Sequence, residues 1–339
     1  MPGSLVEPMG RLFQSEFDYV ARRVNRFRYN YMPFIDIGGI SRTILIAGSG
    51  RSGTTWVGDV IAQLTHTRPM FEPFLLTENR EFAFAQGSHS SRHVDSISII
   101  YGASGSLLPN RQHHALERIL AGRVRAAWID RAARPTIYRG RTIKEIRANL
   151  LLGYITQHWP ELKAIWLVRN AYDVIDSQLA KRSIGWRFEC NIDHLLEQSL
   201  FSRDWLTKIN KAWLKETTKT VVERLTHRWC LENIVPIMQR ITERSNVIRI
   251  DYKDLLTSKE SWDRVARHIS SRDWNPMRLK AILDRPSHTS RSSSERHRTD
   301  TSKWPYLSAE TLKKISNILD AYESLYNVQL IRPEDRQNK

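Results

Sequence analysis

The sequence predicts an α/β fold, because short apolar runs of strand length are followed repeatedly by segments with helical periodicity. Such transitions occur in residues 43–64, 164–179 and 246–256. Short apolar runs bounded by turn residues are typical of buried strands, whereas apolar residues spaced three and four apart are typical of helices. The chain has 339 residues, which is enough for one large α/β domain or two smaller ones.

Residues 43–64, TILIAGSGRSGTTWVGDVIAQL, form the clearest of these units. The apolar run Ile44–Ala47 predicts a buried parallel strand, and a helical pattern begins at Thr54. The turn between them contains glycines that leave backbone N–H groups uncovered, namely Gly48, Gly50 and Gly53. Because uncovered N–H groups at a helix N-terminus bind anions, this segment is predicted to be a phosphate-binding loop.

The residue types in this loop favour one compact anionic group over a metal-bound triphosphate. Gly48 and Gly53 have the spacing of the nucleotide-triphosphatase motif G-x-x-x-x-G-K-[ST]. Thr54 occupies the lysine position of that motif, and the cation of the loop, Arg51, lies inside it. The side chain that would reach the terminal phosphates of a triphosphate is therefore missing.

A second anion site is predicted where the apolar run Ile165–Val168 ends. Arg169 follows this run directly, and Ser177 lies about two turns into the helix that comes next. A guanidinium forms charge-assisted, bidentate hydrogen bonds with phosphate, and a serine hydroxyl adds one more donor. The pair is therefore a candidate for holding a second phosphate.

These segments resemble the sulfotransferases that use 3′-phosphoadenosine 5′-phosphosulfate (PAPS). GSGRSGTTW, residues 48–56, is similar to their 5′-phosphosulfate loop. LVRNAYDVIDSQLA resembles their LVRNPRDVVxSxLA segment, with Ala171 in place of proline and Tyr172 in place of arginine. FEP at 71–73 and KEIR at 144–147 resemble the carbohydrate sulfotransferases more than the cytosolic small-molecule branch. The resemblance covers about residues 43–260.

The resemblance implies a P-loop-like, three-layer α/β/α fold with a central twisted parallel sheet. It also implies PAPS as co-substrate, adenosine 3′,5′-bisphosphate (PAP) as product, and no metal. The residues that it assigns to nucleotide binding are Arg51, Ser52, Gly53, Thr54, Thr55, Trp56, Arg169 and Ser177. Trp56 would stack on the adenine, with a core position as the alternative. Arg51 and Lys144 would offset charge during an in-line transfer, although Lys144 could also be an ordinary strand-end residue.

Glu72 is the residue that we expect to deprotonate the acceptor hydroxyl. It lies between Phe71 and Pro73, and an apolar setting would raise its pKa toward that of a useful base. The corresponding glutamate of the carbohydrate branch has this role; a helix cap or a surface salt bridge is the alternative. The cytosolic branch uses a histidine instead, but Ile146 fills that position here. Four histidines in and just after residues 77–112 are expected to be loop or surface residues: His89, His93, His113 and His114.

The net charge indicates an anionic partner. Lysine and arginine number 52 against 36 aspartate and glutamate residues, giving a formal net charge of +16. A nucleotide co-substrate does not account for all of this charge, so an acidic glycan, a nucleic acid or an anionic lipid surface is a further candidate. We expect no specific nucleic acid, because the sequence has no recognised binding motif and no alternation of aromatic with basic residues.

The predicted function is transfer of the sulfuryl group from PAPS to an acceptor hydroxyl on a carbohydrate or a glycolipid. Two other classes stay open at this point. A P-loop kinase or nucleotide triphosphatase would share the strand–loop–helix unit, but the loop lysine and an acidic metal-binding strand end are missing. A non-catalytic nucleic-acid-binding protein would explain the charge.

Residues 1–40 are predicted to be an N-terminal amphipathic extension, because residues 10–29 carry an apolar helical stripe with arginines largely off it. This helix could pack on the domain, bind a partner helix or contact an anionic membrane peripherally. Residues 41–339 are predicted to be a single sulfotransferase domain. Within it, residues 285–304 read as a basic loop and residues 308–324 as a last helix.

Targeting signals and cysteines give little guidance on location. No apolar run has the length of a transmembrane helix, and the N-terminus carries no hydrophobic signal segment. We therefore expect a cytoplasmic protein, with peripheral membrane contact as the alternative. Cys190 and Cys230 lack metal-ligand spacing and allow at most one disulfide. The oligomeric state is not fixed by the sequence.

Overall fold

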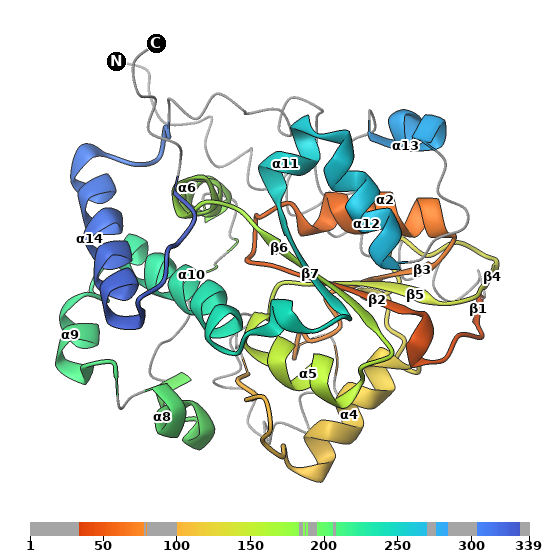
Figure 1. Cartoon of the computed structure of the whole chain (residues 1–339), viewed down its shortest axis with the longest axis horizontal. Coiled ribbons are helices and arrows are strands. Elements are labelled where there is room, and N and C mark those ends of the chain that lie inside the picture. The colour runs from red at the N-terminus through yellow and green to blue at the C-terminus, as the bar shows by residue number, and fades with distance from the viewer. Residues whose placement is uncertain are drawn as a thin grey trace, which may run out of the picture.

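A five-stranded parallel sheet lies at the centre of the protein (Figure 1). The computed structural model describes residues 34–77, 79, 100–182, 186, 188, 195–205, 208–269, 276–283 and 304–332. The strand order is β3 (Arg68–Phe71), β5 (Arg141–Glu145), β2 (Thr43–Ala47), β6 (Lys163–Val168) and β7 (Val247–Asp251). Every neighbouring pair is parallel, as expected of short runs that are apolar throughout.

Helices cover both faces of the sheet, and β2 explains why they must. Ile44 and Ile46 belong to one apolar cluster, whereas Leu45 and Ala47 belong to the other. Because alternate side chains of a strand face opposite sides, a strand of this composition is stable only when both sides are buried. The first cluster is closed by α2 (Thr54–Thr65), α11 (Tyr252–Thr257), α12 (Lys259–Ile269) and α13 (Pro276–Leu283). The second is closed by α4 (Asn110–Leu120), η2 (Asn149–Leu151) and α5 (Leu152–His158). The predicted α/β/α layering is confirmed (Figure 1).

A further apolar cluster is built almost entirely from helices. Its elements are α6 (Ala171–Arg182), α8 (Ser199–Trp205), α9 (Lys211–Glu216), α10 (Val221–Met238) and α14 (Ala309–Tyr326), with η3 (Ile241–Glu243) following α10. Thr220 and Glu223 form a capping box at the start of α10, and Ser308 caps α14 as predicted. Trp205 and Trp229 are buried in this cluster. Both are packing residues.

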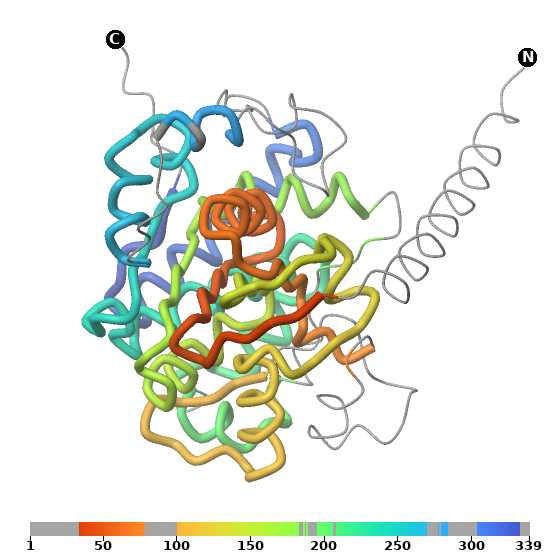
Figure 2. Tube along the Cα trace, turned by 90° about the vertical axis from the view of Figure 1, so that its right-hand side faces the viewer, coloured from red at the N-terminus to blue at the C-terminus, as the bar shows by residue number. Residues whose placement is uncertain are grey.

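Residues 34–40 belong to the folded domain, although the sequence predicted a boundary after residue 40. β1 (Ile35–Asp36) pairs in parallel with β4 (Ile137–Tyr138), and η1 (Ile40–Arg42) leads into β2. Figure 2 shows this first segment running beside the chain that enters β5. The predicted amphipathic helix at 10–29 and the basic residues at 285–303 lie outside the described residues. The peripheral membrane contact proposed for that helix stays a prediction.

Two observations bear on the predictions about location. None of the helices in the described part of the chain is long and apolar enough to cross a membrane. Cys230 lies on α10 with a buried, free thiol, and burial raises its pKa well above the ordinary value. Cys190 lies outside the described residues.

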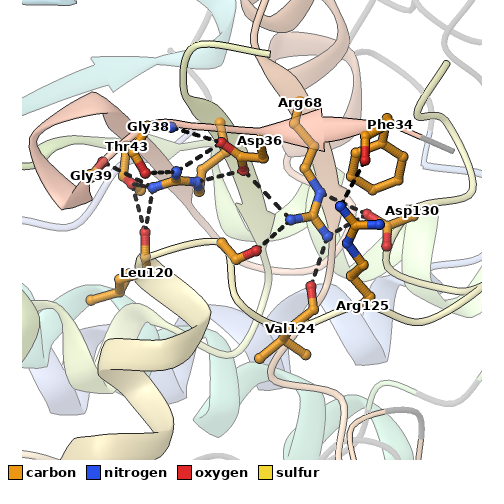
Figure 3. A network of polar contacts seen from close by, with 12 residues as sticks. Phe34, Asp36, Gly38, Gly39, Thr43, Arg68, Leu120, Val124, Arg125 and Asp130 are labelled. Atoms are coloured by element: carbon orange, nitrogen blue, oxygen red, sulfur yellow. Dashed lines mark hydrogen bonds and ion pairs between the residues drawn. The ribbon is translucent and has the colours of Figure 1, made fainter. Parts of the chain in front are cut away.

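Two buried arginines join the amino-terminal ends of β3 and β5 to the segment before β2 (Figure 3). Arg68 and Arg141 are register partners, and both are inaccessible to solvent. Asp36 accepts hydrogen bonds from Arg141 Nε and Nη2 at 2.9 Å and lies 3.5 Å from Arg68 Nη1. Asp130 accepts from Arg68 Nε at 2.8 Å and Nη2 at 2.6 Å. Loop carbonyls accept further N–H groups of the two guanidinium ions, among them those of Leu120, Gly122 and Val124. Both arginines are thus fully engaged in structural contacts.

Asp36→Asn is expected to destabilise the fold strongly, because Arg141 would lose its carboxylate inside a buried site. Removing one partner of a buried ion pair costs about 3–5 kcal/mol. Chemical denaturation followed by circular dichroism measures the loss. Asp254→Asn removes an exposed carboxylate from the first turn of α11 and serves as the control. Its cost should stay below about 1 kcal/mol. Similar losses in the two variants would contradict a structural role for the Asp36 network.

Candidate active site at the carboxyl edge of the sheet

The residues singled out in the sequence gather at the edge where the parallel strands end. Glu72 follows β3, Lys144 lies at the end of β5, the phosphate loop follows β2, and Arg169 follows β6. In parallel sheets, the carboxyl ends of the strands meet at one edge, and ligand sites of α/β proteins are built there. The strand order puts the phosphate loop between Arg169 on one side and Lys144 and Glu72 on the other.

The phosphate loop makes its turn with two residues in the left-handed backbone region, Arg51 (φ 74°) and Gly53 (φ 94°). Gly53 is packed so closely that a Cβ at this position would collide with the Tyr252 ring. As the N-cap of α2 it offers no side-chain acceptor to the first turn of that helix. Ser52 closes the loop by donating to the Ser49 carbonyl from its hydroxyl at 2.6 Å and from its N–H at 3.0 Å. The loop therefore leads into a helix N-terminus suited to an anion.

Hydrogen bonds join the loop to α6, so the two predicted anion sites adjoin. Arg51 Nε donates to the Ser177 hydroxyl at 3.1 Å, and Arg169 Nη1 donates to the Arg51 carbonyl at 3.3 Å. Gln178 donates to the Gly50 carbonyl at 2.8 Å. Arg51, Arg169 and Ser177 thus lie together, as the resemblance implied. Gln178 is a contact that sequence reasoning missed, because nothing in the helical pattern marks it.

Arg169 is held from several sides at the end of β6. Its Nε lies 3.3 Å from Asp173 Oδ2, and its guanidinium lies over the Tyr252 ring at 4.9 Å from the centroid. Its carbonyl accepts the indole N–H of Trp229 at 3.1 Å. Asp173 also accepts the indole N–H of Trp304 at 2.9 Å. These aromatic and acidic supports come from α6, α10, α11 and the segment before α14, which fixes the guanidinium in position before any ligand arrives.

Glu72 lies in a buried cluster of charges at the ends of β3 and β5. Lys144 Nζ donates to Glu72 Oε1, and Arg147 Nη1 donates to Glu72 Oε2 at 3.0 Å. The pairing is set by the sheet, because Phe71 and Lys144 are register partners and Glu72 comes next. Glu145 braces the segment by accepting from the backbone N–H of Phe74 at 2.8 Å and from Arg147 Nη1 at 3.3 Å. The KEIR pattern alone does not indicate that Arg147 contacts Glu72.

The predicted rise in the pKa of Glu72 is wrong. Burial raises this pKa, but the positive charges of Lys144 and Arg147 and their hydrogen bonds outweigh burial and lower the pKa to about 2. Glu72 is consequently ionised at neutral pH and only weakly basic while both cations contact it. Burial likewise lowers the pKa of Lys144, against the attraction of Glu72. Sequence reasoning could not find this, because the two cations lie 72 and 75 positions away.

Trp56 lies in the core, the alternative considered for it above. It is 6% exposed, and its ring packs edge-on against Tyr252 and Trp262, with centroids 5.8 and 5.6 Å apart. The indole N–H is buried and has no hydrogen-bond partner in the described part of the chain. Adenine stacking by Trp56 stays a prediction, and it would use a ring that is already engaged on two sides.

Of the four histidines considered above, the two that the structure describes serve packing or the surface. His113 Nδ1 contacts the Tyr154 hydroxyl at 2.8 Å, and its ring stacks on Trp159 at 4.8 Å. These contacts hold α4 against α5. His114 is exposed and lies 3.4 Å from Glu117 on the same helix. His89 and His93 lie outside the described residues.

The segment that contains all of these residues also matches a known family. Residues 43–269 match the family model described as the sulfotransferase family, which is well over half of the chain. The chain belongs to the sulfotransferase family. It is therefore a transferase that carries out sulfuryl transfer, and the kinase and nucleic-acid-binding alternatives are set aside. The family match includes the phosphate loop, Glu72, Lys144, Arg169 and Ser177.

Several solved sulfotransferases are similar to the chain at low identity. A mouse sulfotransferase complexed with PAP is 12% identical, with 84% of each chain covered and a TM-score of 0.42. The sulfotransferase domain from the curacin biosynthetic pathway is 15% identical, covering 84% of this chain and 98% of that chain, with a TM-score of 0.39. A retinol dehydratase in complex with androsterone and PAP is 14% identical, with 89% of this chain and 84% of that chain covered and a TM-score of 0.37. No curated protein matches the chain.

Gly53→Ala is expected to disrupt the loop, because φ at this position is left-handed and the new Cβ would meet the Tyr252 ring. Backbone strain of this kind costs about 1–3 kcal/mol, before any loss from the collision. Thermal unfolding monitored by circular dichroism measures it. Gly39→Ala is the control, since φ is −74° there and the nearest atom to an added Cβ is 3.9 Å away. If both variants melt like the parent chain, the strained loop described above is wrong.

Proposed function

We propose that this enzyme transfers the sulfuryl group of PAPS to a hydroxyl of a carbohydrate or a glycolipid, with Glu72 as general base. The observation that carries the proposal is the junction of the phosphate loop with α6. Arg51 Nε of the phosphate loop donates to Ser177 of α6, and Arg169 Nη1 donates to the Arg51 carbonyl. A ligand that carries phosphate-like groups on the 3′ and 5′ oxygens of one ribose fits two adjoining anion sites.

The nucleotide is proposed to bridge the two sites. The 5′-phosphosulfate would contact the loop residues Arg51, Ser52, Gly53, Thr54 and Thr55, and the 3′-phosphate would contact Arg169 and Ser177. The start of α2 supports this assignment, because Gly53 gives the first turn of that helix no side-chain cap. Arg169 is preorganised by Asp173 and Tyr252, which favours binding of a fixed anionic group. The proposal requires no metal.

The chemical step is proposed to be an in-line displacement. The acceptor hydroxyl attacks sulfur, its proton passes to the Glu72 carboxylate, and the bond from sulfur to the bridging oxygen breaks. The bond electrons move to that oxygen, and PAP leaves with the additional charge. Arg51 and Lys144 are the cations that offset this charge. Positioning and electrostatics carry most of the catalysis in such transfers.

Lys144 is proposed to couple the base to the leaving group. In the structure it is hydrogen-bonded to Glu72, and its charge is one of the two that lower the pKa of that carboxyl to about 2. When Lys144 turns toward the bridging oxygen, one of these charges withdraws. The proton affinity of Glu72 then rises at the moment when the hydroxyl proton is released. A buried, ion-paired carboxylate can thereby act as a base.

The nature of the acceptor is a proposal that rests on two short segments. FEP at 71–73 and KEIR at 144–147 are both part of the Glu72 cluster, and both resemble the carbohydrate sulfotransferases. The net charge of +16 suits an acidic glycan or glycolipid.

Glu72→Gln is expected to abolish most of the transfer while leaving PAP binding intact. Loss of a general base lowers kcat by about 10²- to 10⁴-fold. Transfer of labelled sulfate from PAPS to a panel of oligosaccharides and glycolipids measures activity, and calorimetry with PAP confirms that the variant is folded. His114→Ala, on the exposed face of α4, is the control and should keep full activity. Loss of activity in the histidine variant alone would rule out Glu72 as the base.

The same assay tests the pH dependence. Because the pKa of Glu72 is lowered to about 2, this carboxyl stays ionised throughout the mildly acidic range. Titration of Glu72 should therefore cause no fall of kcat/KM near pH 4.5, so any fall there in the parent chain should also be present in Glu72→Gln. A fall there that disappears in the variant would mean that Glu72 is not ion-paired in the free enzyme.

A further inference from the structure

Arg131 lies beside the proposed base and has no anionic partner among the residues that the structure describes. Phe71 N donates to the Ile129 carbonyl at 2.8 Å, so the segment with Arg131 runs along the open edge of β3. The guanidinium lies over the Phe71 ring at 3.5 Å from the centroid and near the Trp128 ring at 4.7 Å. Its Nε is buried without a hydrogen-bond partner. No residue in the described part of the chain forms an ion pair with Arg131.

The surrounding charges leave Arg131 as the cation in excess. Lys144 and Arg147 are both paired with Glu72, and Arg147 also contacts Glu145. Arg131 is attracted by Glu72 and, more weakly, by Asp59 of α2. Burial lowers the pKa of Arg131 to about 10, so it keeps its charge at neutral pH. The cluster therefore presents a third cation that no carboxylate of the described chain contacts directly.

Arg68 shows what a purely structural arginine looks like in this fold. It is completely buried, and its guanidinium donates to Asp130 and to the Gly122 and Val124 carbonyls. Arg131 is half-buried and is held by aromatic rings instead. An arginine stacked on aromatic rings is fixed in position but keeps its N–H groups for another acceptor. A half-buried guanidinium with an unused Nε is costly unless a ligand completes it.

We propose that Arg131 binds an anionic group of the acceptor, so that the acceptor is a hydroxyl compound that also carries a carboxylate, sulfate or phosphate. This inference rests on the proposed function, because it takes Glu72 to face the acceptor hydroxyl. The hydroxyl must lie within hydrogen-bond reach of Glu72. Phe71 is the neighbour of Glu72 in the chain, and its ring carries Arg131. An anion a few bonds from the hydroxyl therefore meets the guanidinium.

The strand order separates Arg131 from the proposed nucleotide sites. The phosphate loop follows β2 and Arg169 follows β6, whereas Arg131 lies against β3, the strand at the opposite edge of the sheet. β5 lies between β3 and β2. The acceptor side of the site thus extends from Glu72 toward the edge at β3, and the nucleotide side extends toward β6. Arg131 belongs to the acceptor side.

The test compares Arg131→Gln with Arg134→Gln in PAP-saturated protein. Arg134 is exposed three residues along the same segment, so its replacement makes an equal change in net charge. Ligand-observed NMR at constant ionic strength measures the binding of matched pairs: glucose and glucuronate, N-acetylglucosamine and its 6-sulfate, and glucose and glucose 6-phosphate. In the parent chain, anionic members should bind more tightly than their neutral partners. Because a charge-assisted hydrogen bond contributes about 1.5–3 kcal/mol, Arg131→Gln should lower this preference by roughly 10- to 100-fold.

Arg134→Gln should leave the preference unchanged, and Arg131→Lys should keep part of it, because lysine retains the charge without the planar fork. The inference is overturned if no anionic member of the panel is preferred, or if Arg131→Gln keeps the preference. It is also overturned if Arg131→Gln weakens PAP binding, since Arg131 would then belong to the nucleotide side. Failure of the parent chain to bind PAP would instead count against the proposed function.

Discussion

The contact between the phosphate loop and α6 is the interaction on which the candidate site depends. The loop contributes N–H groups and Arg51, and the β6–α6 unit contributes Arg169 and Ser177. Neither half is specific alone, since glycine turns before helices and arginines at strand ends are common. Their direct hydrogen bonds, at 3.1 and 3.3 Å, join the two halves into the one surface on which we propose that both phosphate-like groups bind. The sheet makes this possible, because β2 and β6 are neighbours with parallel register.

The two edges of the sheet use arginine in different ways. At the amino-terminal edge, Arg68 and Arg141 are buried and saturated by carboxylates and loop carbonyls, so they fix the fold. At the carboxyl edge, Arg169 and Arg131 keep part of their surface and rest against aromatic rings. Stacking fixes a guanidinium without using its hydrogen-bond donors. The amino-terminal edge thus fixes the fold, whereas Arg169 and Arg131 at the carboxyl edge are the cations that we propose to contact ligands.

Much of the fold, and the gathering of Arg51, Arg169 and Ser177 at one edge of the sheet, could be predicted from sequence, because their signals are local. The strand, loop and helix at residues 43–64 follow directly from apolar spacing and glycines. The two positions that depart from the family pattern are accounted for by contacts in the structure, one of them local and one distant. Asn170 accepts the N–H of Asp173 at 2.9 Å and so starts α6 without the usual proline at 171, and Tyr172 stacks on Trp304 at 5.0 Å.

The remaining features depend on contacts between distant parts of the chain. The pKa of Glu72 was predicted in the wrong direction because its two cations arrive from β5 and the turn after it. Residues 34–40 were left outside the domain because Asp36 acquires its role only through Arg68 and Arg141. Arg131 carries no sequence signal at all, since only the folded segment along β3 brings it to Phe71.

The most direct test of the central claim is a thermodynamic cycle measured by calorimetry. PAP and adenosine 5′-monophosphate, which lacks the 3′-phosphate, are each titrated into the parent chain and into Arg169→Gln. If Arg169 holds the 3′-phosphate, the parent chain prefers PAP by roughly 10- to 100-fold, the contribution of a charge-assisted contact, and the variant loses that preference. An equal preference in both proteins, or none in the parent chain, would contradict the account.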